Sequence, residues 1–135
     1  MTLVVPNAGE VINLSYFVGK NTVVRNVIYK LFATNVTPAE GDTAGSYTEA
    51  AGGGYSTMAA LTGASWTVTG GAPTSASYAQ ISWTFTGALT TNATIYGYYV
   101  IRATDVDLCW AETFTSFTPA NNGDQILLTP AITAE

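Results

Sequence analysis

Apolar and polar residues alternate along several short stretches of the chain. In residues 81–86, Ile81, Trp83 and Phe85 fall on one face and three hydroxyl side chains fall on the other. Residues 65–69 repeat this pattern with Trp66 and Val68. Because successive side chains of a strand point to opposite faces, this period of two predicts half-buried antiparallel strands with a hydroxyl-rich outer face.

Other stretches are apolar on both faces. Residues 23–33 and 94–103 are rich in β-branched and aromatic residues, which predicts central strands or strands covered on their outer face by a partner. Gly97 interrupts the second stretch and indicates a bulge or a close approach of another backbone. Residues 11–18, 108–114 and 125–129 complete the predicted strands.

Turn residues separate these stretches at short intervals, for example the glycines at 52–54 and the Asn-Asn-Gly-Asp sequence at 121–124. Residues 39–51 are predicted to form a loop, with one helical turn as the alternative. The pattern predicts an all-β fold: a single-domain antiparallel β-sandwich, jelly-roll-like, over residues 1–135. Residues 1–9 are expected to form a short arm and residues 130–135 a tail, although either could be a strand of the domain.

Composition and charge exclude two classes of partner. Of the 135 residues, 47% are hydrophobic and only 10% are charged, against roughly 25% in an ordinary soluble domain. The net charge is −5 and the four basic residues are scattered, so the chain lacks a basic surface for phosphates. We therefore expect neither nucleic acid nor a membrane surface as a partner. So little charge fits a protein that hides much of its surface against other proteins.

The side chains that catalysis needs are scarce. The chain has no histidine, which removes the usual partner of a nucleophilic serine or cysteine. Its one cysteine, Cys109, excludes an internal disulfide and is expected in the core. The N-terminus has no basic region followed by a long apolar core, so synthesis in a reducing cytoplasm is expected.

The carboxylates near residue 110 are the strongest candidates for chemistry. Glu112 with Asp105 or Asp107 offers the acid pair of a glycoside hydrolase, and the Asp105–Asp107 spacing suits calcium. Solvated carboxylates, with Glu112 paired to a cation such as Arg102, explain the same residues. We predict no enzymatic activity, no catalytic residue, no metal and no cofactor.

Aromatic side chains point to contacts with other molecules. Three tyrosines between residues 96 and 99 occupy both faces of one predicted strand, so at least one ring is expected outside the core, and tyrosine is enriched at interfaces. The apolar residues of the predicted arm could add a strand to a neighbour. The predicted partner interface therefore consists of Leu3, Val4, Val5, Tyr96, Tyr98 and Tyr99. Tyr47, Tyr55 and Tyr78 in predicted loops would instead favour a sugar-binding surface.

Three segments resemble small structural proteins of tailed bacteriophages, of the capsid decoration (cement) type. They are residues 29–55 (YKLFATNVTPAEGDTAGSYTEAAGGGY), 96–100 (YGYYV) and 108–114 (LCWAETF). The resemblance implies a non-enzymatic virion protein on the capsid surface, made in the cytoplasm of the bacterial host. It implies that the major capsid protein and further copies of the chain, as a homotrimer, are its partners. A carbohydrate- or receptor-binding domain of a head or tail fibre is the alternative.

Overall fold

The computed structural model describes residues 3–18 and 26–134. This part of the chain forms one α-helix, α1 (Asn7–Phe17), two short 3-10 helices (Ala44–Ser46 and Gly63–Ser65) and ten strands. The strands are β1 (Val27–Phe32), β2 (Ala51–Gly52), β3 (Thr67–Thr69), β4 (Thr74–Ser77), β5 (Ile81–Thr84), β6 (Leu89–Thr91), β7 (Ile95–Arg102), β8 (Leu108–Phe117), β9 (Gln125–Leu128) and β10 (Ala131–Ala134). All the strand pairs are antiparallel.

The most deeply buried sheet has the order β1-β7-β8. Every residue of its middle strand β7 except Tyr96 is buried. Tyr98 and Val100 belong to the main core, whereas Tyr99 and Ile101 belong to a second cluster on the other face, together with Tyr47. The loop that carries Tyr47 therefore covers the outer face of this sheet, so a partner is not needed there.

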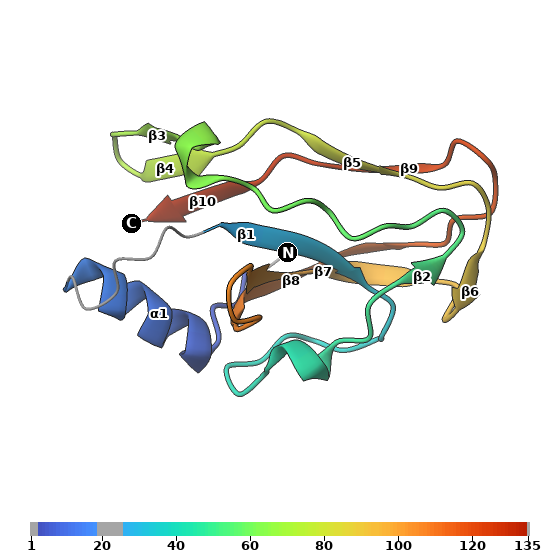
Figure 1. The fold of residues 1–135 in the computed structure, drawn as a ribbon, viewed down its shortest axis with the longest axis horizontal. Coiled ribbons are helices and arrows are strands. Elements are labelled where there is room, and N and C mark those ends of the chain that lie inside the picture. Colours follow the sequence, from blue (N-terminus) through green and yellow to red (C-terminus); the bar gives the residue numbers. More distant parts are fainter. Residues whose placement is uncertain (1–2, 19–25, 135) are drawn as a thin grey trace.

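β3, β4, β5, β9 and β10 form a second layer, which lies above β1, β7 and β8 in Figure 1, whereas β2 and β6 pair with each other beside β7. β4 pairs with β10, and β5, the next strand along the chain, pairs with β9. A hydrogen bond of 2.9 Å from the Tyr78 amide to the Pro130 carbonyl joins the two ladders. Their registers differ by one residue, so residues 74–84 and 125–134 run side by side as one long, interrupted pair.

Aromatic rings fill the space between the layers. Trp83 and Phe85 from the upper layer belong to the same buried cluster as Tyr29, Leu31 and Tyr98 from the lower sheet. The ring centroids of Tyr29 and Tyr98 lie 5.4 Å apart. Burial of large aromatic side chains is among the strongest contributions to the stability of a small domain, and this cluster holds the layers together.

The segment after β2 closes one side of this core. Leu61 and Val27 exchange backbone hydrogen bonds at the edge of β1, and the Thr86 amide donates to the Gly53 carbonyl just beyond β5. In Figure 1 this green segment runs between β1 and the upper layer. The edges of β1 and β5 on this side are therefore spanned by the chain itself.

These observations confirm the predicted all-β fold with antiparallel strands, and they place strands at six of the predicted stretches (β1, β3, β5, β7, β8 and β9). Residues 23–25 of the first predicted strand lie outside the described residues, as do residues 1–2 of the arm and residue 135 of the tail. The jelly-roll-like sandwich stays a prediction. Trp83, Phe85 and Cys109 are buried as expected, and Trp66 is half-buried.

The predicted strand at 11–18 is wrong, because residues 7–17 form α1. The stretch has apolar residues on every side, so its pattern does not distinguish a helix from a strand. Contacts with β8 favour the helix: an added Cβ at Gly9 would lie 2.2 Å from the Cys109 carbonyl oxygen, so only glycine allows this close approach. Ile12 faces the core, whereas Val11 and Leu14 remain exposed.

Two smaller expectations also need correction. Val68 in β3 is 70% exposed, so this short edge strand has no apolar core face. The predicted tail contains β10, whose residues 131–134 pair with β4. Both segments are short and rich in small or hydroxyl side chains, so their alternation carries little information on burial.

Gly97 allows β7 to pack against both neighbouring strands. The register of β7 on β8 shifts between residues 95 and 97, and an added Cβ at Gly97 would lie 2.2 Å from the Glu112 carbonyl oxygen and 2.7 Å from the Phe32 ring. The predicted bulge or close approach is therefore confirmed, and both features occur together.

We expect Gly97→Ala to destabilise the protein by about 1–3 kcal/mol, the usual range for overpacking of a core. Gly41→Ala is the matched control, because no atom lies within 4 Å of an added Cβ there. Urea unfolding followed by circular dichroism measures both free energies. An unfolding midpoint of Gly97→Ala equal to that of Gly41→Ala would contradict this account of the bulge.

Candidate functional site

The apolar residues of the predicted arm lie against the body of the same chain. Leu3, Val4 and Val5 are half-buried. Val4 and Ala111 exchange two backbone hydrogen bonds of 3.0 Å at the outer edge of β8, and Leu3 and Val5 pack against the main core. Residues 3–5 are therefore part of the fold rather than an extended arm, which corrects the expectation for this segment.

Two of the three tyrosines assigned to the interface are internal. Tyr98 is 6% exposed and Tyr99 is 4% exposed, whereas Tyr96 is half-buried. Burial, with a smaller effect of the nearby Glu49 charge, raises the pKa of Tyr99 to about 12. The placement of Tyr98 and Tyr99 at a surface is therefore corrected: both are core residues, one on each face of β7.

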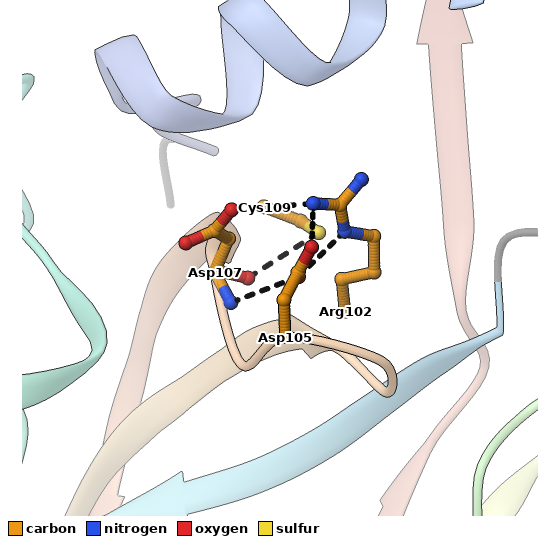
Figure 2. Close-up of polar contacts among 4 residues, drawn as sticks. All are labelled: Arg102, Asp105, Asp107 and Cys109. Atoms are coloured by element: carbon orange, nitrogen blue, oxygen red, sulfur yellow. Dashed lines mark hydrogen bonds and ion pairs between the residues drawn. The ribbon is translucent and has the colours of Figure 1, made fainter. Parts of the chain in front are cut away.

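The aspartates considered for calcium bind an arginine instead. Arg102 at the end of β7 donates from Nε to Asp105 Oδ1 at 2.6 Å, forms a second contact with the same carboxylate, and lies 3.3 Å from Asp107 Oδ2 (Figure 2). Val106 between them has a positive φ of 57°, which folds the turn back onto the arginine. Within the described ranges, the structure brings no three acidic, histidine or cysteine side chains together as a metal site.

Glu112 is the third carboxylate considered for catalysis. It accepts a hydrogen bond from the Tyr98 hydroxyl, so its expected pairing with Arg102 is wrong. Arg102 is occupied by the aspartates, and each acidic side chain of the proposed hydrolase pair is held by its own partner. These contacts stabilise the framework of β7 and β8.

The sequence did not indicate a further polar cluster at the edge of β1. Glu49 accepts hydrogen bonds from Lys30 (2.8 Å), Tyr55 (2.9 Å) and Thr57 (2.5 Å). The Tyr55 hydroxyl in turn accepts from the Leu31 amide at 3.2 Å. Lys30 and Glu49 are 19 residues apart, so only the fold brings them together. The cluster fixes the start of the segment that closes one side of the core.

The opposite side of the core opens into an apolar groove of about 420 Å³ between β8 and β9. Its lining is uncharged and comes from five strands: Leu31, Trp83, Tyr98, Phe114, Thr115, Phe117, Ile126, Leu127 and Leu128. Ile126 pairs with Trp83 and faces the same way, yet it is only half-buried whereas Trp83 is 4% exposed. The core is therefore incompletely covered along β9.

Trp83, one of the residues that line this groove, has a buried polar atom without a hydrogen-bond partner in the described part of the chain. Its indole Nε1 is buried and has no hydrogen-bond acceptor among the described residues. A buried donor without an acceptor costs about 1–3 kcal/mol, so most such groups in proteins are paired.

Helix α1 presents a second exposed apolar surface. Val11, Leu14 and Val18 are 64%, 63% and 69% exposed, and their spacing places them along one side of the helix and the turn that follows it. Ile12 on the opposite side is buried. The helix therefore shows apolar residues both to the core and to solvent.

The loop tyrosines proposed for sugar binding pack within the chain. Tyr47 is buried and stacks on Tyr99 with ring centroids 5.2 Å apart, and Tyr78 meets Trp66 edge-on at 5.4 Å. Tyr55 is half-buried and donates to Glu49. Tyr47 is therefore a core residue, whereas Tyr55 and Tyr78 are half-buried and contact other side chains of the chain.

Comparisons with known proteins do not identify the chain: no family model, no curated protein and no solved structure matches it. In the part of the chain that the structure describes, no helix is long and apolar enough to cross a membrane.

The Glu49 cluster predicts a dependence of stability on pH. Burial alone would raise the pKa of Glu49, but hydrogen bonds from Lys30, Thr57 and Tyr55 and the lysine charge together lower the pKa below its ordinary value. A carboxyl with a lowered folded-state pKa stabilises the fold above its unfolded-state pKa, near 4.3, and loses this contribution as the pH falls through the folded-state pKa.

We expect Glu49→Gln to be less stable than the unmodified protein by about 1–2 kcal/mol at pH 7, toward the lower end of the roughly 1.5–3 kcal/mol for hydrogen bonds to a charged group, because the Glu49 side chain is partly exposed to solvent. The difference should shrink as the pH falls below about 4. Thermal unfolding from pH 7 to pH 3 measures it, with Glu40→Gln, an exposed carboxyl, as control. A difference that stays constant down to pH 3 would contradict the role assigned to the Glu49 charge.

Proposed function

We propose that this protein is a non-enzymatic capsid decoration (cement) protein of a tailed bacteriophage, which binds the assembled shell of the major capsid protein and stabilises it. The observation that carries the proposal is the uncharged groove beside β8 and β9, which the described chain leaves open. Its neutral, apolar lining suits contact with another protein. The resemblance of residues 29–55, 96–100 and 108–114 to phage structural proteins supports the class of partner.

The polar groups are consistent with a structural role. The carboxylates Glu49, Asp105 and Glu112 each have a cation or a tyrosine as partner, and they serve the framework. Meanwhile several large apolar side chains stay exposed, among them Leu14 and Leu127. The polar contacts therefore stabilise the fold, and apolar surface remains available for association.

A cement protein acts by binding the assembled shell more tightly than the separate subunits. Each bound copy then stabilises the assembly in proportion to the logarithm of its concentration over its Kd, about 2.7 kcal/mol at a hundredfold excess. Many copies on one shell add their contributions. In this proposal the chain acts on the outer capsid surface, is made in the bacterial cytoplasm and functions as a homotrimer, which gives each unit three contacts with the shell.

The test uses heads of the phage that encodes this chain, prepared without it. Purified protein should sediment with the heads, saturate at a fixed number of copies per capsomer, and raise the temperature at which the heads break open. It should bind unassembled major capsid protein much more weakly, because the proposed site is formed by neighbouring subunits.

Failure to bind heads would overturn the proposal. Equal affinity for heads and for unassembled subunits would overturn the cement mechanism, because a ligand with equal affinity for both states shifts no equilibrium.

A further inference from the structure

The two sides of the core are closed differently. Between β1 and β5 the chain supplies its own cover, residues 53–61, through the backbone contacts at Gly53 and Leu61. On the β8–β9 side, the described N-terminal residues 3–18 pair with β8 at Ala111 alone. Residues 108–111 of β8 are buried, whereas residues 112–117 are half-buried or exposed. Among the described residues, cover of β8 therefore decreases beyond Ala111.

Two strand edges flank the groove without a backbone partner. β9 pairs with β5 on one side, and β8 pairs with β7 on one side. Among the described residues, no backbone hydrogen bond reaches the other edge of β9 or that of β8 beyond Ala111. Unpaired edges are templates for a further strand, which supplies amide donors and carbonyl acceptors at strand spacing.

The lining defines the chemistry of the occupant. It contains no charged side chain, and its polar groups are the Tyr98 and Thr115 hydroxyls and the Trp83 indole. The volume of about 420 Å³ is many times the roughly 30 Å³ of a water molecule, so one water does not fill it. Apolar side chains fit this lining.

We propose that the groove between β8 and β9 receives an extended, uncharged segment of the major capsid protein, which pairs with an open strand edge and places apolar side chains beside Trp83 and Phe114. This inference rests on the proposed function and adds the docking site to it. A peptide strand accounts for two observations together: the open strand edges and the neutral lining. A free apolar ligand accounts only for the lining.

Thr115→Arg tests the site. Thr115 is exposed at the mouth of the groove, so a guanidinium there places a charge where the uncharged segment would lie without disturbing the buried core. Thr69→Arg is the matched control: it makes the same change at an exposed threonine of β3, in a different sheet. Heads lacking the protein are titrated with each variant, after thermal unfolding has shown that both are folded.

We expect Thr115→Arg to weaken head binding at least tenfold and Thr69→Arg to change it less than twofold. Hydrogen exchange of the unmodified protein on heads is the second measurement, and it does not depend on any variant. Residues 112–117 and 125–128 should gain protection on binding.

Three results would overturn the inference. If unmodified protein binds heads but both variants bind equally well and protection appears elsewhere, the groove is not the docking site, although the proposed function stands. If light scattering shows a trimer that Thr115→Arg converts to monomer, the occupant is a second copy. If the unmodified protein does not bind heads at all, the proposed function fails, and this inference fails with it.

Discussion

The close packing around β7 is the constraint on which the rest of the structure depends. This strand is buried on both faces and pairs on both edges, and Gly97 lets it approach the Phe32 ring and the Glu112 carbonyl more closely than any other residue would. One face of β7 packs against the upper layer through the aromatic core, and the other face packs against the loop around Tyr47. A side chain at position 97 would have to displace the Glu112 carbonyl of β8 and the Phe32 ring of β1.

The position of the groove follows from how the two edges of the sheet are covered. β1 is followed by a long connection that returns along its own edge and is tied down by Lys30, Glu49 and Tyr55. β8 is longer than β7, and the described part of the N-terminal segment pairs with it at Ala111. The second half of β8 and the inward face of β9 therefore lack cover from the described residues, and this is where we propose that a partner binds.

The sequence predicts the regular parts of the fold and much less of the surface. Trp83, Phe85 and the residues of β7 could be assigned because strict alternation or a run of β-branched and aromatic residues reports directly on burial. Residues 11–18 carry apolar side chains in both periods, so their pattern does not distinguish a helix from a strand. For Val68 and β10 the pattern was too short to report on burial.

The candidate site was predictable only in part, for a related reason. The sequence shows that Tyr96, Tyr98 and Tyr99 lie on both faces of one strand. It does not show that the loop around Tyr47, about fifty residues earlier, covers the face that carries Tyr99. The groove joins residues of five strands, and its signal in the sequence was weak: Phe114 and Phe117 in β8 have no regular polar alternation around them. The expectation that the chain is not an enzyme rests on the sequence, because a chain without histidine has few ways to build a catalytic centre, and it stays a prediction.

Cryo-electron microscopy of heads with and without the protein tests the central claim most directly. The account predicts extra density at fixed positions on the outer shell, into which the β7 and β8 sheet fits, with an extended segment of a capsid subunit lying beside β9. Extra density confined to the tail or to fibres, or none on any part of the particle, would contradict the assignment as a capsid decoration protein.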